Sequence, residues 1–87
     1  MKRDINCVKA ILEYLESQIE TPVVVDKMVE DMKTQWYKEK GLYHLGILVD
    51  GGYVNRFYPE AFSIPATYEL TWKGHDLLDS LRNNGVL

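Results

Sequence analysis

The stretch GLYHLGILVDGGYV, residues 41–54, decides the fold because it joins a helical pattern of apolar residues to a strong helix stop. Apolar residues at spacings of three and four predict a helix within residues 36–50 that buries one face. The side chains expected on that face are Leu42, Leu45, Leu48 and Val49. Gly41 weakens the first turns, so we expect the helix to begin there or to be held there by tertiary contacts. Gly51 and Gly52 end it, because glycine readily takes the left-handed conformation that closes a helix.

The chain before this stretch predicts two further helices and a short strand. Apolar residues recur with helical spacing over residues 4–18, and Asp4 is placed to cap the first turn. Pro22 ends this helix, and the three valines after it predict a short strand. Asp26 is expected to cap a second helix over residues 26–34. The apolar faces of the two helices comprise Ile5, Val8, Ile11, Leu12, Leu15, Ile19, Met28, Val29 and Met32.

The chain after the stretch predicts a β-hairpin and a last helix. Two β-rich runs, residues 53–58 and 68–70, are joined by a proline-flanked connection that is too long for a tight turn. Thr71 is placed to cap the last helix, and Gly74 to let that helix pack closely on the sheet. The helix is expected to bury Trp72, Leu77, Leu78 and Leu81 and to stop at Asn83, Asn84 and Gly85.

The order of these elements indicates an α+β fold. The predicted order is that of a winged helix-turn-helix: helix, short strand, helix, turn, helix, strand, loop, strand and helix. Such a fold has a three-helix core, here with a two-stranded β-wing and a C-terminal helix. We expect residues 1–87 to form this one domain. Its core is expected to contain Leu12, Leu15, Leu45, Leu48 and Trp72.

Composition argues against several classes of protein. A chain with 46% hydrophobic and 26% charged residues is typical of a folded soluble domain. Apolar runs are short and the N-terminus carries charge, so we expect no membrane span, no signal peptide and a cytoplasmic location. Cys7 is the only cysteine and the two histidines are far apart in sequence. We therefore expect no disulfide, no metal and no other cofactor.

The distribution of charge is more informative than the net charge of −3. Residues 1–32 hold four basic and seven acidic side chains (−3), and residues 59–87 hold two and four (−2). Residues 33–58 hold four basic and two acidic side chains (+2). The only basic third of the chain therefore contains the helix within residues 36–50 and the first strand of the hairpin, where phosphate contacts would be needed.

These two elements carry the candidate DNA-binding residues, because winged-helix regulators insert the corresponding helix into the major groove. Lysines suit phosphate or guanine contacts, and tyrosine and histidine can donate hydrogen bonds to a phosphate or a base. The side chains expected to face DNA from the helix are Lys38, Lys40, Tyr43, His44 and Ile47. From the wing, Asn55, Arg56 and Tyr58 are expected to reach a minor groove or the backbone.

Other interpretations of the same residues stay open. Any amphipathic helix needs a solvated face, and Glu39 would repel phosphate. An exposed Ile47 beside Tyr43 fits a protein contact at least as well as a DNA groove. A single arginine is weak evidence, and Arg56 fits an arginine that solvates the edge of a strand somewhat better than a functional contact.

Two further sites receive a structural interpretation. Asp76 or Asp79 could orient His75 for catalysis, but no serine, cysteine or second carboxylate stands beside it in a recognisable motif. We therefore expect a structural histidine and no enzyme activity. Cys7 lies in a first helical turn, where the helix dipole would lower a thiol pKa, but without a nearby base we expect a small, partly buried side chain.

Three segments together resemble a family of small proteins of unknown function encoded by phages and prophages. They are MKRDINCVKAIL (residues 1–12), YHLGILVDGGYV (residues 43–54) and LTWKGHDLLDSLRNN (residues 70–84). The most specific element, TWxGHxxLD, is carried here by Thr71, Trp72, Gly74, His75, Leu78 and Asp79, with Leu77 where the family is associated with phenylalanine. The resemblance implies a winged-helix fold and a phage or prophage setting, and it brings no activity with it.

Two functions follow as hypotheses. The placement of positive charge slightly favours a protein that binds double-stranded DNA, as a homodimer and as a transcriptional or replication accessory factor. The alternative is a winged-helix interaction module that binds a phage or host protein through Tyr43, Ile47 and the wing.

Overall fold

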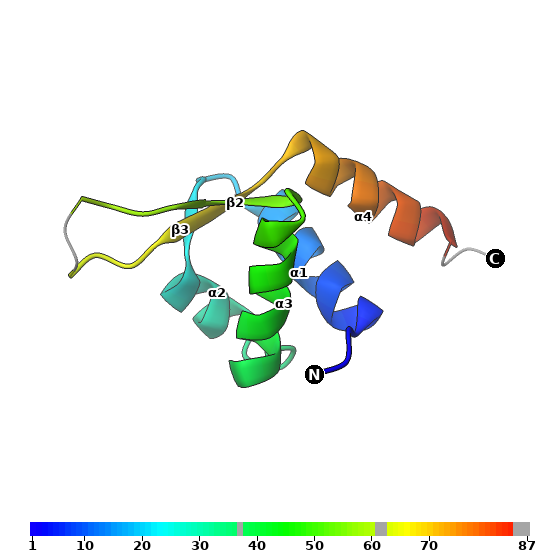
Figure 1. Ribbon diagram of the computed structural model, residues 1–87, viewed down its shortest axis with the longest axis horizontal. Coiled ribbons are helices and arrows are strands. Elements are labelled where there is room, and N and C mark those ends of the chain that lie inside the picture. Colours follow the sequence, from blue (N-terminus) through cyan, green and yellow to red (C-terminus); the bar gives the residue numbers. More distant parts are fainter. Residues whose placement is uncertain (37, 61–62, 85–87) are drawn as a thin grey trace.

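The computed structural model describes residues 1–36, 38–60 and 63–84, which form helices packed beside a small sheet (Figure 1). The elements are, in order, α1 (Ile5–Ser17), β1 (Val23–Val24), α2 (Val25–Asp31), α3 (Lys38–Asp50), β2 (Val54–Phe57), β3 (Thr67–Leu70) and α4 (Trp72–Asn84). This α+β arrangement is compatible with a winged-helix fold. Within the described ranges, every helix is too short or too polar to cross a membrane. Gly85, the predicted stop of α4, lies outside the described residues.

Local sequence signals set most helix ends. The Asp4 carboxylate accepts two backbone N–H groups and caps α1, as predicted. Gly52 has φ +82° and closes α3 in the left-handed conformation, which is also as predicted. The Thr71 hydroxyl accepts the backbone N–H of Gly74 at 3.0 Å and caps α4. The prediction that Asp26 caps α2 is wrong, because α2 begins one residue earlier and the carboxylate lies in its first turn.

The sheet has three antiparallel strands in the order β1-β3-β2. The predicted hairpin is confirmed, with Arg56 of β2 opposite Tyr68 of β3. Val23 of β1 lies opposite Tyr68 on the other side, so β1 adds a third strand to the predicted two-stranded wing. In Figure 1 the hairpin and α4 project toward opposite ends of the molecule, with α1, α2 and α3 between them.

The core lies between the three central helices, the sheet and α4. Of the predicted core residues, Leu12, Leu15, Leu45 and Leu48 are buried as expected. The other buried apolar side chains are Cys7, Val8, Ile11, Val23, Met28, Met32, Trp36, Val54, Tyr68 and Leu78. Leu77 and Leu81 are half-buried against this core, which is consistent with an inward-facing side of α4.

The prediction that Trp72 lies in the core is wrong, because its side chain is 85% exposed. The inward side of α4 is set by Gly74, where a Cβ atom would lie only 2.1 Å from the carbonyl oxygen of Tyr53. The helix approaches the backbone so closely that this position must face inward. Trp72 is two residues earlier, about 200° around the helix axis, and therefore faces solvent. Gly74 allows the close packing that the sequence predicts.

Four other apolar side chains predicted to be buried are exposed, namely Ile5, Ile19, Val29 and Leu42. Ile19 lies beyond α1, which ends at Ser17 because Gln18 adopts an extended backbone. Val29 and Leu42 line a groove between α2 and α3 that opens to solvent. Helical spacing predicted the buried leucines of α1, α3 and α4, but not the exposure of Trp72 or how far the neighbouring elements cover each helix.

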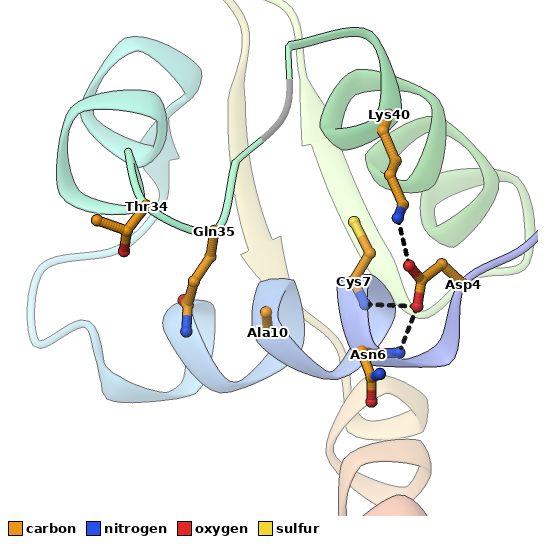
Figure 2. Close-up of a pocket in the computed structure, with 7 residues that line it drawn as sticks. All are labelled: Asp4, Asn6, Cys7, Ala10, Thr34, Gln35 and Lys40. Atoms are coloured by element: carbon orange, nitrogen blue, oxygen red, sulfur yellow. Dashed lines mark hydrogen bonds and ion pairs between the residues drawn. The ribbon is translucent and has the colours of Figure 1, made fainter.

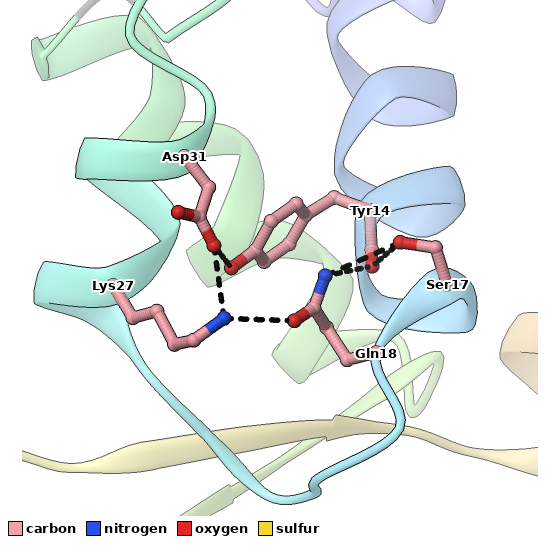
Figure 3. Close-up of polar contacts among 5 residues, drawn as sticks. All are labelled: Tyr14, Ser17, Gln18, Lys27 and Asp31. Carbon is pink, nitrogen blue, oxygen red and sulfur yellow. Dashed lines mark hydrogen bonds and ion pairs between the residues drawn. The ribbon is translucent and has the colours of Figure 1, made fainter.

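A polar cluster joins the C-terminal end of α1 to α2 (Figure 3). The Tyr14 hydroxyl donates a 2.6 Å hydrogen bond to Asp31. This hydrogen bond and a second one from the Lys27 ammonium group lower the pKa of the Asp31 carboxyl. Lys27 lies 2.9 Å from Asp31 and also donates to the side chain of Gln18 at 3.0 Å. The hydrogen bonds of Tyr14 and Gln18 thus connect α1 and the residue after it to α2.

Candidate functional site

The outward side of α3 has an apolar centre between charged ends. Leu42 is 47% exposed and Tyr43 is 39% exposed. Lys38 and Glu39 are exposed at the N-terminal end of the helix, and Asp50 is exposed at its C-terminal end. The outward position predicted for Tyr43 is therefore correct. The helix presents one exposed lysine, Lys38, together with two carboxylates, which is a poor match to a row of phosphates.

The prediction that His44 faces outward is wrong, because the side chain is fully buried. Its Nε2 atom accepts the backbone N–H of Asp4 at 2.8 Å. Its Nδ1 atom lies 2.7 Å from the carbonyl oxygen of Lys40, and because Nε2 accepts a hydrogen bond, Nδ1 is the nitrogen that donates to this carbonyl. His44 precedes the buried Leu45, and α1 covers this part of α3, so the buried face is wider than the leucine spacing predicts. The ring attaches the start of α1 to α3.

Lys40 also contributes to this attachment. Its ammonium group forms an ion pair with the Asp4 carboxylate (Figure 2). The hydrogen bond from Lys40, helped by the backbone N–H groups of Asn6 and Cys7, lowers the pKa of the Asp4 carboxyl. A phosphate would have to compete with that carboxylate for the lysine.

A pocket of 240 Å³ lies beside this ion pair, between α1, the α2–α3 turn and the start of α3 (Figure 2). The residues that line it are Asp4, Asn6, Cys7, Ala10, Thr34, Gln35 and Lys40. Cys7 is buried more fully than the partly buried side chain predicted, and burial raises the pKa of its thiol. A protonated thiol beside a neutralised ion pair gives this pocket little capacity for nucleophilic chemistry or anion binding.

Ile47 is half-buried rather than exposed beside Tyr43. It lies in a groove of 290 Å³ between α1, α3 and α4. The other residues that line this groove are Arg3, Ile5, Val8, Leu48, Gly51, Tyr53, Leu77 and Leu81. Ile47 therefore lies at this groove, where α1 and α4 approach α3, and is only half-exposed.

The wing holds its arginine against two tyrosines. The Arg56 Nε atom donates to the hydroxyl of Tyr68 at 3.1 Å, and Nη1 donates to the hydroxyl of Tyr58 at 3.1 Å. The guanidinium carbon lies 5.4 Å from the centre of the Tyr68 ring, within the range of a cation–π contact. Arg56 is half-buried, whereas Asn55 and Tyr58 are exposed. Of the three wing candidates, the arginine is thus the one whose side chain is engaged by other side chains of the wing.

A groove of 440 Å³ separates α2 from α3. Its lining comprises Val25, Asp26, Val29, Lys33, Trp36, Lys38 and Leu42. Trp36 is only 7% exposed, and its Nε1 atom has no hydrogen-bond partner among the described residues. A Cβ atom on Gly41 would lie 2.5 Å from the indole ring, so the glycine lets α3 pack directly on the tryptophan. This is the tertiary contact expected to hold α3 at Gly41.

Sequence reasoning did not identify Trp36 as a site residue. The available signal was a tryptophan five positions before a glycine inside a predicted helix. That combination indicates a place where a large ring packs against a helix backbone.

The start of α4 is tied to the turn after α3 by polar contacts. The Thr71 hydroxyl donates to the carbonyl oxygen of Gly52 at 2.7 Å. The Lys73 ammonium group donates to the carbonyl oxygen of Gly51 at 2.8 Å and lies 4.6 Å from the centre of the Tyr53 ring. Thr71 and Gly74 of the TWxGHxxLD element therefore help to attach α4. The exposed Trp72 side chain contributes little to this attachment in the part of the chain that the structure describes.

His75 attaches α4 to α1. Its Nδ1 atom lies 3.2 Å from a carboxylate oxygen of Glu16, and Arg82 lies 2.9 Å from the other oxygen. These partners, with Arg82 the stronger, lower the pKa of the Glu16 carboxyl. This environment agrees with the structural interpretation of His75. No group of three histidine, cysteine, aspartate or glutamate side chains in the described ranges is arranged to hold a metal ion.

Comparison with known proteins gives a family. Residues 2–86 match the family described as "Hypothetical protein (DUF2513)". The chain is also 33% identical over 93 aligned residues to an uncharacterised protein of Haemophilus influenzae (strain Rd), an alignment that covers 99% of this chain and 72% of that protein. No solved structure matches the chain significantly. The chain belongs to the DUF2513 family of hypothetical proteins.

Proposed function

We propose that this protein is a winged-helix module that binds a phage or host protein in the cytoplasm through an apolar surface on α2 and α3. The α2–α3 surface is defined here as Val29, Leu42 and Tyr43. The observation that carries the proposal is their exposure, 39%, 47% and 39%, on neighbouring helices beside an open groove. Exposed apolar side chains that lie together mark protein contacts, whereas DNA interfaces are more polar and more positively charged.

The charged residues near this surface support a protein partner over DNA. Lys40 is paired with Asp4, and Arg56 is engaged by two tyrosines. Glu39 and Asp50 add negative charge to the outward side of α3. Phosphate contacts supply most of the non-specific affinity for DNA, and of the cationic side chains expected to face DNA only Lys38 is exposed.

The proposal is tested with Leu42→Asp, because the side chain is exposed and the change should leave the core intact. Ile19→Asp is the matched control, since Ile19 is a fully exposed isoleucine outside the α2–α3 surface. Fragments of phage and host proteins are displayed as a library, and those that bind the purified chain are selected. We expect at least a tenfold loss of affinity with Leu42→Asp and less than a twofold change with Ile19→Asp. Binders that tolerate both changes would contradict the proposal.

DNA binding is the second candidate function, and one observation favours it. Lys38, Asn55 and Tyr58 are exposed on α3 and on the hairpin, the two elements that a winged helix presents to a duplex. In a selection from random duplexes at low salt, Lys38→Ala should make the slope of log affinity against log salt shallower by about 0.9. No enriched sequence, or a slope that this change leaves unaltered, would remove the candidate.

A homodimer through α4 is a further part of the proposal. It is supported by Trp72, a large aromatic side chain that is 85% exposed. Sedimentation at high micromolar concentration should show a dimer that Trp72→Ala converts to a monomer. A wild-type monomer under these conditions would exclude it.

A further inference from the structure

The groove between α2 and α3 contains a buried polar atom that the fold does not satisfy. Trp36 lines the groove and is 7% exposed, and its indole N–H finds no acceptor among the described residues. Most buried donors in folded proteins have an acceptor, because losing the hydrogen bond to water is costly. The Nε1 atom is itself buried beside the groove, so a bound molecule supplies the missing acceptor only if the side chains around the ring move aside.

The walls of the groove are apolar and its rim is basic. Val25, Val29 and Leu42 form apolar wall on both helices. Lys33 and Lys38 contribute two positive charges to the lining, against the single carboxylate of Asp26. Lys33 lies 3.4 Å from Glu30, but both side chains are more than 70% exposed, so this pair exchanges easily with another anion.

These features define complementary chemistry. The apolar walls fit aliphatic or aromatic side chains, and the lysines fit an acidic group. An oxygen of that acidic group would also be an acceptor for the indole N–H. A volume of 440 Å³ accommodates several side chains but not a folded domain.

We propose that the groove binds an acidic amphipathic segment of the partner protein, a proposal that rests on the protein-binding function above. Apolar side chains of the segment pack against Val29 and Leu42. A carboxylate of the segment pairs with Lys33 or Lys38 and accepts the N–H of Trp36. An amphipathic helix in a groove is a common mode of peptide recognition and supplies such side chains at spacings of three and four.

The first test uses a displayed library of random 16-residue peptides biased toward helix. Peptides selected on the wild-type chain should be enriched in aspartate and glutamate and carry apolar residues with helical spacing. The double variant Lys33→Glu, Lys38→Glu should bind them at least tenfold more weakly. The matched control is Lys2→Glu, Lys9→Glu, which changes the net charge equally at the N-terminal end and should alter affinity less than twofold.

The second test observes the Trp36 indole directly. In a Trp72→Phe variant, Trp36 is the only tryptophan, so its indole proton and nitrogen give one assigned NMR signal. A selected peptide should move this proton downfield, as expected when an N–H gains a strong acceptor. The same peptide with its acidic residues replaced by leucine should not.

The outcomes separate this inference from the function on which it rests. Selected peptides that have no acidic excess, or that tolerate the charge reversal, overturn the acidic partner while leaving the protein-binding proposal in place if Leu42→Asp abolishes their binding. An indole signal that does not move on binding overturns the contact with Trp36. If all selected peptides bind the wild-type chain and the Leu42→Asp variant with equal affinity, the protein-binding proposal itself is overturned.

Discussion

Trp36 and Trp72 occupy opposite environments, and the two regions around them are held together in different ways. Trp36 is buried, and the backbone of α3 packs on its ring at Gly41. Trp72 faces solvent at the start of α4, where the helix is attached by the Thr71 hydroxyl, by a close backbone approach and by ion pairs to α1. Packing on the buried Trp36 ring thus adds to the polar contacts that attach α3, whereas α4 is attached by backbone fit, polar contacts and the buried Leu78 without its tryptophan.

The largest expected effect is the difference in stability between two variants in which one tryptophan or the other is replaced by alanine. Trp36→Ala should lower the free energy of unfolding by about 3–5 kcal/mol, since it removes a buried ring and leaves a cavity. Trp72→Ala should change it by no more than about 0.5 kcal/mol, because the exposed ring makes little contact. Urea titration of both variants measures the difference. If Trp36→Ala does not fold, Trp36→Phe keeps a ring and should lose less. Equal losses for the two alanine variants would contradict the comparison.

Two glycines of α3 sharpen the same comparison. Gly41→Ala would place a Cβ atom 2.5 Å from the Trp36 ring and should cost about 1–3 kcal/mol of stability through overpacking. Gly46→Ala meets no atom within 4 Å and should stabilise the helix by up to about 1 kcal/mol through its better helix propensity. Chemical denaturation measures both. Stabilisation by Gly41→Ala would show that α3 does not depend on close packing against Trp36.

A smaller effect is expected at the cap of α4. Thr71→Ala removes the acceptor for the Gly74 N–H and the donor to the Gly52 carbonyl, and should cost roughly 1 kcal/mol. Thr71→Ser keeps the hydroxyl and should recover most of that stability. Hydrogen exchange in α4 should be faster in the alanine variant alone. Equal stability of the alanine and serine variants would mean that the hydroxyl does not attach the helix.

The smallest effect is a pH dependence of the α4 attachment. Arg82, with a lesser contribution from His75, lowers the pKa of the Glu16 carboxyl in the folded state below its unfolded value. The contribution to stability is therefore present above the usual glutamate pKa of about 4.3 and is lost as pH falls through the lower folded pKa. The melting temperature should fall on acidification below about pH 5 less steeply in Arg82→Gln than in the wild type. Parallel curves would contradict this attachment.

Much of the backbone plan could be predicted from sequence because it depends on local physics. The spacing of Leu12, Leu15, Leu45 and Leu48 places them on single helix faces, and those faces are buried. Asp4 and Thr71 cap helices through their own side chains, and Gly52 ends one through its backbone freedom. These signals act within a few residues, so they can be read without knowing the neighbours.

The candidate site was predicted less well than the fold. Tyr43, Lys38, Asn55 and Tyr58 are exposed as expected, but His44 is buried, Ile47 is half-buried, and Lys40 and Arg56 are engaged by side chains from other parts of the chain. His44 accepts a hydrogen bond from residue 4, which is 40 positions away. No pattern within the helix contains that information.

By itself the sequence determined the order of helices and strands, the caps at Asp4 and Thr71, the stop at Gly52 and most of the leucines of the core. Only the tertiary structure decided that Trp36 is buried and Trp72 exposed, that His44 fastens α1 to α3, and that Val29 and Leu42 line an open groove. The physical reason is that helix spacing fixes the direction of a side chain about its own axis. Whether that direction meets water or another element depends on where distant parts of the chain pack.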